Sequence, residues 1–395
     1  MNTKLTAFVL ISLSIIIVGL YPEYTQGNSP VKPVEHFPVS KKRIDAVFVL
    51  DTTGSMGGLI QAAKEKIWSI ASTLASEQSS PEIRVGLIAY RDRGDDYITQ
   101  VIDLSGDLDT LNATLMDFQA KGGGDSPESV NQALHDAVHN ISWSNDTDAY
   151  KVIFLVGDAP PHMDYQDDVK YPLTLTQAAQ KGIVVNTIQC GSDSAATTAW
   201  QQVAQLGRGQ YFQVEQAGNA VTVKTPYDKK LAKLSADLDS TRLYYGSVKD
   251  KARQKQKMDA TNKLNSLASP ESLARRATFN TSKSGSGNLL GKGELVDEIA
   301  SGRRDLSEID SELLPKPMQA MTPDQRQLHI ETKAARRETL KKQIKTIADK
   351  RSRYLEKEIA EAGGAENSLD QKLYDVVRMQ GTSRGLIFDS DKPAY

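Results

Sequence analysis

The sequence is poor in the residues on which disulfide, thiol and zinc chemistry depend. Its 395 residues include one cysteine, Cys190, and five histidines. A single thiol excludes an internal disulfide framework. Cys190 ends the apolar run VVNTIQC and no histidine-bearing motif accompanies it. We therefore expect this thiol to pack inside a strand and not to act as a nucleophile.

A strong charge of either sign is also absent. The 48 Lys and Arg residues nearly balance the 50 Asp and Glu residues, so the formal net charge is −2. This balance gives no support to a nucleic-acid partner or to an anionic membrane surface. The motifs Gly-x-Ser-x-Gly, Walker A and Gly-x-Gly-x-x-Gly are missing too, which removes the common signatures of serine hydrolases and nucleotide-binding enzymes.

A long apolar run lies at the N-terminus. Residues 5–21 read LTAFVLISLSIIIVGLY and follow a single lysine. The run is long for the core of a signal peptide and slightly short for a full membrane span. We expect residues 1–27 to be either a cleaved signal peptide or an N-terminal membrane anchor. In both cases the rest of the chain is expected to be exported, to the periplasm or the extracytoplasmic face of the membrane.

Short apolar runs alternate with helical segments after a proline-containing linker at residues 28–42. The alternation predicts an α/β fold with a doubly wound, mostly parallel and Rossmann-like sheet over residues 43–216. The predicted strands are 44–51, 83–90, 99–103, 151–157, 183–190 and 210–214. The predicted helices are 57–76, 107–119, 127–140, 173–182 and 196–206.

The strand pattern stops near residue 217. Residues 217–265 read as a charged helical segment, and residues 266–292, rich in Ser, Gly and Asn, as a flexible loop. Residues 293–395 predict a helical C-terminal region whose clearest element is a helix at 323–361. We expect the apolar stripe of that helix to bind a second helix, 368–379, in a coiled-coil-like helical hairpin.

Carboxylates and hydroxyls follow the predicted strands at the end where parallel sheets bind ligands. Asp51, Thr53 and Ser55 leave the first strand as alternate residues, so their side chains can converge. Asp158 follows the fourth strand, and the loop KGGGDSPESV supplies Asp125. An oxygen set without histidine or cysteine suits Mg²⁺, with Mn²⁺ or Ca²⁺ as alternatives, and not zinc.

These residues resemble those of the von Willebrand factor type A domain with its metal-ion-dependent adhesion site (MIDAS). DTTGS at 51–55 fits the family motif Asp-x-Ser/Thr-x-Ser, and GGGDSPE at 122–128 and Asp158 follow in the family's order. The resemblance implies that Thr53 and Ser55 bind the metal directly. It also implies that Asp51 and Asp158 bind it directly or through water, and that a carboxylate from a protein partner completes the shell.

The second loop departs from the adhesive members of that family, which usually carry threonine where this chain has Asp125. AYRDRGDDY at 89–97 and GGGDxPE resemble a subgroup found in many bacterial proteins and in some eukaryotic kinases. No kinase segment accompanies them, and we expect the bacterial exported type. We expect Asp125 to contact the metal, to cap the following helix, or to do both, since Asp125-x-x-Glu128 is itself a capping box. A third carboxylate would neutralise the ion further, so we expect tighter metal binding and a weaker pull on the partner.

We therefore expect a non-enzymatic module that binds a protein through a divalent cation. A metal-dependent hydrolase is the alternative, and it would need a general base near the ion. His162 is the one candidate, although its place in the sequence is more typical of a loop surface. A purely structural ion is a third hypothesis. Arg91, Asp92 and Asp96 follow the second strand and are candidates for supporting the metal loops.

Overall fold

The computed structural model describes residues 42–75, 80–124, 126–216, 223–361 and 368–388. The predicted signal peptide or anchor at 1–27, nearly all of the linker at 28–42, and Asp125 therefore lie outside the described residues. In the part that is described, no helix is both long and apolar enough to cross a membrane.

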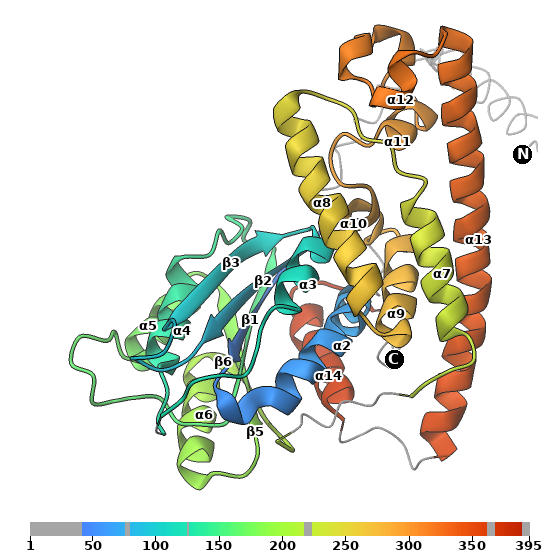
Figure 1. Ribbon diagram of the computed structural model, residues 1–395. Coiled ribbons are helices and arrows are strands. Elements are labelled where there is room, and N and C mark those ends of the chain that lie inside the picture. The colour runs from blue at the N-terminus through green and yellow to red at the C-terminus, as the bar shows by residue number, and fades with distance from the viewer. Residues whose placement is uncertain (1–41, 76–79, 125, 217–222, 362–367, 389–395) are drawn as a thin grey trace, which may run out of the picture. The chain divides into compact units, whose positions relative to one another are not determined.

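A six-stranded sheet forms the centre of the α/β region, in the order β3-β2-β1-β4-β5-β6 (Figure 1). All neighbouring strands are parallel except β2 and β3, and the predicted fold class is confirmed. The strands β1 and β4 are buried almost throughout, as parallel strands covered on both faces should be. The bounds are β1 (Arg43–Asp51), β2 (Glu82–Tyr90), β3 (Thr99–Ser105), β4 (Tyr150–Gly157), β5 (Ile183–Cys190) and β6 (Arg208–Val214).

Helices cover both faces of this sheet and create two cores. One core contains Trp68 of α2, and the other contains Trp200 of α6; both side chains are fully enclosed. Cys190 is buried in the first core, as its apolar run predicted. The helices of the α/β region are α2 (Gly57–Ala75), α3 (Leu108–Leu115), α4 (Val130–His139), α5 (Tyr171–Gln180) and α6 (Ser194–Leu206).

The flexible loop expected at 266–292 is wrong, because most of this segment is helical. Ser269 caps α9 by accepting a hydrogen bond from the backbone of Ser272, and Pro270 occupies the first turn. Leu273, Ala274 and Ala277 are then buried along one side. The helices of this second region are α7 (Asp228–Asp239), α8 (Val248–Leu267), α9 (Pro270–Thr281), α10 (Ser286–Leu290), α11 (Leu295–Ala300), α12 (Lys316–Gln319), α13 (Pro323–Glu361) and α14 (Leu369–Thr382).

The predicted long helix is present as α13, but the helical hairpin is wrong. The apolar stripe of α13, with Leu340 and Ile344, packs on α7 and α9. The α14 helix instead packs beside α2 and β6 (Figure 1). Periodicity defines the apolar face of a helix and leaves its partner open, so the nearer helix in sequence was the wrong choice.

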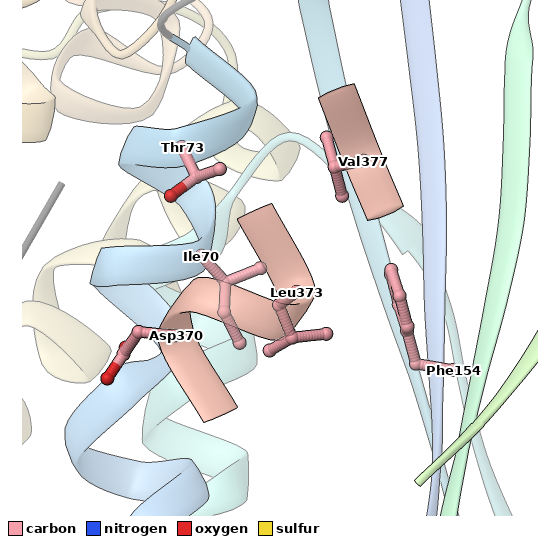
Figure 2. Close-up of a pocket in the computed structure, with 6 residues that line it drawn as sticks. All are labelled: Ile70, Thr73, Phe154, Asp370, Leu373 and Val377. Atoms are coloured by element: carbon pink, nitrogen blue, oxygen red, sulfur yellow. The ribbon is translucent and has the colours of Figure 1, made fainter. Parts of the chain in front are cut away.

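Figure 2 shows how α14 joins the α/β region. Leu373 of α14 lies beside Ile70 of α2, over Phe154 of the sheet. The cavity left between these elements is about 10 Å³, room for one water at most. Gln380 of α14 accepts a hydrogen bond from Tyr150 Oη at 2.7 Å and donates one to Asn186 Oδ1 at 2.8 Å. Helix α14 thus packs in the same layer as α2, although the two are far apart in the sequence.

We expect Gln380→Ala to lower the free energy of unfolding by about 1–3 kcal/mol, because Tyr150 Oη and Asn186 Nδ2 both donate to Gln380 Oε1 and would lose this buried acceptor. Urea unfolding measures the change. Met379→Ala is the control, because this neighbouring side chain is 53% exposed. An equal loss in both variants would contradict the docking of α14 on the sheet.

A buried cluster of charges joins α3 to the helical region. Arg276 of α9 is fully buried and donates to Asp109 at 2.6 and 2.7 Å and to Asp239 of α7 at 2.8 Å. Lys257 of α8 lies 2.7 Å from Asp107, directly before α3. Ion pairs therefore join the α/β region to helices α8 and α9, and the pair of Arg276 with Asp109 is withdrawn from water.

Candidate metal centre

The first loop of the site begins where β1 ends. Asp51 is fully buried, and its Oδ1 accepts hydrogen bonds from the backbone nitrogen of Thr53 at 2.8 Å and from Thr53 Oγ1 at 2.6 Å. Ser55 Oγ lies 3.4 Å from Thr53 Oγ1. The structure thus brings together the three side chains that alternation along the chain predicted.

The third loop supplies Asp158 at the end of β4, the strand beside β1. A Cβ at Gly157 would collide with the Tyr90 hydroxyl and lie 3.1 Å from Asp51 Cβ, so a glycine is needed where the two strand ends meet. Asp158 Oδ2 accepts a hydrogen bond from Gln216 Nε2 at 2.7 Å. Asp158 therefore faces the same space as Thr53 and Ser55, with its orientation fixed by Gln216.

The second loop approaches through glycines. Gly122 and Gly123 have φ angles of 75° and 76°, and Gly54 donates to the Gly122 carbonyl at 3.0 Å. A Cβ on Gly123 would lie 3.0 Å from Thr53 Cβ, which is closer than most Cβ contacts in proteins. The left-handed backbone and the close approach together require glycine here. Metal contact by Asp125 stays a prediction, since that residue lies outside the described part.

The second loop also contributes a residue that the sequence reasoning did not place in the site. Glu128 is buried, its Oε1 would lie 3.1 Å from a Cβ on Gly123, and its Oε2 has no hydrogen-bond partner in the described structure. Its backbone bonds to Pro160 and His162, which ties the second loop to the third. The position of Glu128 just before the apolar face of α4 could have indicated from the sequence that this side chain is buried.

The capping box expected at Asp125-x-x-Glu128 is wrong. The α4 helix begins at Val130, with Ser129 at the N-cap position, so Glu128 precedes the helix. A glutamate in a capping box would stand in the third helical position, reaching back to the cap. Glu128 is instead available to the cavity.

A cavity of about 350 Å³ opens between the three loops. Thr53, Ser55, Glu128 and Asp158 line it, together with Gly122–Gly124, and Asp51 lies bonded behind Thr53. No three His, Cys, Asp or Glu side chains among the described residues are grouped to hold a metal by themselves. Among the described residues, a cation here would draw on the hydroxyls of Thr53 and Ser55 as well as on the carboxylates.

Too little positive charge lies near the carboxylates of this site to offset their negative charges. Burial raises the pKa of Asp51 to about 7; Thr53 opposes this through its hydrogen bonds, and Asp158 adds to it. Burial, followed by the charges of Asp51 and Asp92, raises the pKa of Glu128 to about 9. Both shifts show that negative charge is disfavoured here, as expected where like charges share a poorly solvated space. A bound cation would reverse that preference.

Two residues after β2 support the loops as expected. Arg91 donates to the Thr52 carbonyl at 3.2 Å, and Asp92 accepts from Ser129 Oγ at 2.9 Å. Asp96 is exposed and lies 3.5 Å from Arg91. The first loop is thus held from Arg91 and the second from Asp92, while Asp96 contributes from the surface.

The loop-surface position expected for His162 is wrong. Its ring is buried, stacks on Tyr165, and lies 3.4 Å from Asp92 and 2.8 Å from Asp164. Tyr165 Oη in turn donates to Asp92 at 3.0 Å. The imidazole is held within this polar cluster and is not among the residues that line the metal cavity.

A family model described as von Willebrand factor A domain matches residues 46–225. This region, with its doubly wound sheet, is therefore a von Willebrand factor A domain. The predicted bacterial exported type and GGGDxPE subgroup remain predictions. A curated relative, an ariadne-like RING finger protein of Acanthamoeba polyphaga mimivirus, is 29% identical over 119 residues. That match covers 30% of this chain and 11% of the viral protein.

Solved structures with similar folds include proximal thread matrix protein 1 from the mussel byssus, at 13% identity and a TM-score of 0.35. That match covers 45% of this chain and 43% of the mussel protein, so this chain spans less than half of it. The SpRpn10 VWA domain has 14% identity and a TM-score of 0.34, covering 44% of this chain and 89% of that domain. The mussel protein has also been solved with a zinc-occupied MIDAS motif, at 14% identity and a TM-score of 0.36, covering 45% of this chain and 42% of that one.

Proposed function

We propose that the von Willebrand factor A domain at residues 46–225 binds a divalent cation through Asp51, Thr53, Ser55 and Asp158, and uses it to hold a protein partner. One observation carries this proposal. Asp51 Oδ2 and Glu128 Oε2 are buried carboxylate oxygens without a hydrogen-bond partner in the described structure, and they belong to the same three-loop site. Buried charge of this kind is costly unless it is paired or coordinates a metal.

The donors fit a hard cation. Carboxylate and hydroxyl oxygens are the ligands that Mg²⁺ and Mn²⁺ prefer, with Ca²⁺ as a larger alternative. The zinc in the mussel structure supports the choice of a divalent ion in such a fold. When bound, the cation supplies a positive charge that an acidic side chain of a partner can approach. We favour Mg²⁺ because every donor proposed here is oxygen.

The chain's own residues would orient these donors. The Thr53 hydroxyl donates a hydrogen bond to Asp51 Oδ1, which leaves the lone pairs of Thr53 Oγ1 free to face the cavity. Gln216 holds Asp158 through Oδ2. Both contacts fix ligands before the ion arrives, which lowers the conformational cost of binding.

Glu128 sharpens the expected character of the site. It places another negative charge beside Thr53, whether or not Asp125 adds a further one. More negative charge should strengthen cation binding and weaken the attraction for a partner's carboxylate. We therefore expect a metal that stays bound without the partner, and a partner interaction of modest affinity.

A non-enzymatic role fits this arrangement better than hydrolysis. A hydrolase needs a general base within reach of a metal-bound water. The ring nitrogens of His162, the expected candidate, instead contact Asp92, Asp164 and Tyr165. Recognition of a protein therefore remains the proposal, with hydrolysis as the alternative and a structural ion as one outcome of the test below.

Export is the part of the proposal that rests on the sequence alone. The apolar run at 5–21 supports placement of the domain outside the cytoplasm, by secretion or by an N-terminal membrane anchor. Fractionation of cells that express the full-length chain measures it. Recovery in the cytoplasmic fraction alone would contradict the proposal.

Affinity capture from cell-envelope extracts tests the binding function. We expect a partner to be recovered by the wild-type protein with Mg²⁺, and to be lost with EDTA or in Ser55→Ala. Ser126→Ala is the matched control, because Ser126 lines the same cavity and is not among the proposed ligands. Equal recovery under all conditions would contradict metal-mediated binding. Thermal stabilisation by Mg²⁺ with no metal-dependent partner would assign the ion a structural role.

A further inference from the structure

The loop between β2 and β3, residues 91–98, contacts both the second and the third loop of the metal centre. Two of its charged side chains, Arg93 and Asp95, stand on either side of Gly94. Gly94 has a φ of 96°, a left-handed conformation that suits glycine. The backbone nitrogen of Asp95 donates to the Asp92 carbonyl at 3.3 Å. This tight turn allows Arg93 and Asp95 to reach different neighbours.

Asp95 holds the backbone of the second loop. Its Oδ2 accepts a hydrogen bond from the backbone nitrogen of Gly123 at 3.0 Å. The carboxylate also packs directly on Gly122, where a Cβ would collide with Asp95 Oδ1. Gly123 in turn lies against Thr53 of the first loop. The hydrogen bond to Asp95 therefore fixes the part of the second loop that meets a proposed metal ligand.

Arg93 holds the third loop at a point beyond Asp158. Its guanidinium donates to Asp168 Oδ1 at 2.6 Å and to Asp167 Oδ1 at 2.9 Å. It also lies 4.1 Å from the centre of the Tyr165 ring, a favourable cation–π distance. The Asp168 side chain is 3% exposed, and a buried carboxylate needs a cationic partner. Arg93 supplies that partner from a different loop.

The segment held by Arg93 is connected to the metal loops by direct contacts. Tyr165 stacks on His162, with 4.0 Å between the ring centres. The backbone nitrogen of His162 donates to the Glu128 carbonyl at 3.0 Å, and the backbone nitrogen of Glu128 donates to the Pro160 carbonyl at 2.9 Å. Pro160 lies two residues after the proposed ligand Asp158. The position of the third loop is therefore linked to that of the second.

Neither Arg93 nor Asp95 lines the cavity of about 350 Å³ between the metal loops. Both side chains therefore act on the site through other residues. Arg93 also carries a charge of the same sign as the proposed ion, so attraction for the ion does not account for its place beside the site. Its contacts with the third loop do.

We propose that Arg93 and Asp95 are positioning residues of the metal centre. Asp95 fixes the glycine backbone of the second loop, Arg93 fixes the third loop, and the turn at Gly94 joins these two contacts. The expected effect on metal binding rests on the proposed cation site. The contacts with the loops do not require an ion, so they can be tested in its absence.

Hydrogen–deuterium exchange in EDTA and calorimetric titration of Mg²⁺ test the role of Asp95 in the full-length protein. Asp95→Asn and Asp95→Ala remove the same charge, but asparagine keeps an acceptor oxygen for the Gly123 amide. We expect about tenfold faster exchange of that amide in Asp95→Ala than in Asp95→Asn. Mg²⁺ should bind about fivefold more weakly to Asp95→Ala than to Asp95→Asn, the equivalent of one hydrogen bond. Equal values for the two variants in either measurement would overturn the role of Asp95.

Arg93→Met tests the contact with the third loop through the sign of the effect. Loss of a positive charge near a cation site should strengthen Mg²⁺ binding if charge alone matters. We expect about fivefold weaker binding instead, because the third loop loses its ion pairs and its stacking partner. Lys121→Met is the control, because this exposed lysine directly precedes the glycines of the second loop and its loss should not weaken binding. Unchanged or tighter binding in Arg93→Met, or an equal loss in both variants, would overturn the role of Arg93.

Exchange in EDTA separates the failure of this inference from the failure of the proposed function. If the wild type does not bind Mg²⁺, the cation site is wrong, and the exchange rates still show whether the two side chains hold the loops. In Arg93→Met, peptides that cover residues 162–168 should exchange about tenfold faster than in the wild type. Wild-type exchange of these peptides would overturn the contact with the third loop, whatever the result with Mg²⁺.

Discussion

The Arg276→Met variant is expected to lose about 3–5 kcal/mol of unfolding free energy, because it leaves a buried pair of carboxylates without their cation. Arg276 is the centre of the cluster that joins α3 to α9 and α7, with Asp109 at 2.6 Å and Asp239 at 2.8 Å. Methionine keeps most of the volume and removes the charge. Urea unfolding monitored by tryptophan fluorescence measures the loss.

Arg336→Met is the control for that prediction. Arg336 is 58% exposed and lies 3.9 Å from Asp237, so its removal should cost less than about 1 kcal/mol. A similar cost for both variants would contradict the view that buried charge fastens the helices to the α/β region.

The same cluster gives a pH dependence with a definite sign. Burial opposes the ionisation of Asp109, but the charges of Arg276 and Lys257 outweigh it and hold the pKa of this carboxyl well below its usual range. A lowered pKa contributes stability above the ordinary aspartate pKa near 4 and loses it as the pH falls further. The difference between wild type and Arg276→Met should therefore narrow from pH 5 to pH 2.

The Asp51→Asn variant is expected to be more stable than the wild type in EDTA at pH 8 and to gain nothing from Mg²⁺. Asp51 is fully buried with an unpaired oxygen, and its raised pKa of about 7 means that folding at pH 8 must bury a charge. Asparagine keeps the acceptor for Thr53 without that charge, which should gain about 1–4 kcal/mol. Thermal unfolding with and without Mg²⁺ measures both effects.

The size of this stability difference depends on pH. A raised carboxyl pKa lowers stability as the pH rises from about 4 to about 7. The advantage of Asp51→Asn in EDTA should therefore shrink toward pH 5, where the folded wild type carries a protonated Asp51. Greater stability of the wild type at pH 8 in EDTA would contradict the account of Asp51 as a carboxylate prepared for a cation.

The sequence predicted the α/β region well because its strands carry their own signal. Runs such as AVFVL and VIFLV, buried on both faces, end at polar residues and give both the strands and the location of the site. The contact of Asp51 with Thr53 could also be predicted, because alternate residues of an extended chain point to the same side. The helix α13 was equally clear from its capping residues and its terminal Gly-Gly.

What the sequence did not predict depends on contacts between distant segments. The α9 helix contains two buried arginines and few large apolar residues, so its composition resembles a loop until the partners Asp109 and Asp239 are in place. The docking of α14 on α2 joins residues some 300 positions apart through Ser69 and Asp370. Glu128 lies in the site because the backbone at Gly123 approaches Thr53 closely. This contact joins distant segments, so no local sequence pattern predicts it.

Calorimetric titration of Mg²⁺ or Mn²⁺ into the wild type, Ser55→Ala and Ser126→Ala tests the central claim most directly. Ser55 is exposed, and the hydrogen bond of its hydroxyl to Thr53 Oγ1 is long at 3.4 Å, so its removal should leave the fold unchanged. We predict saturable binding of one ion to the wild type, at least tenfold weaker binding to Ser55→Ala, and wild-type affinity in Ser126→Ala. Equal affinity of all three proteins, or no binding by the wild type, would contradict a cation held at the ends of β1 and β4.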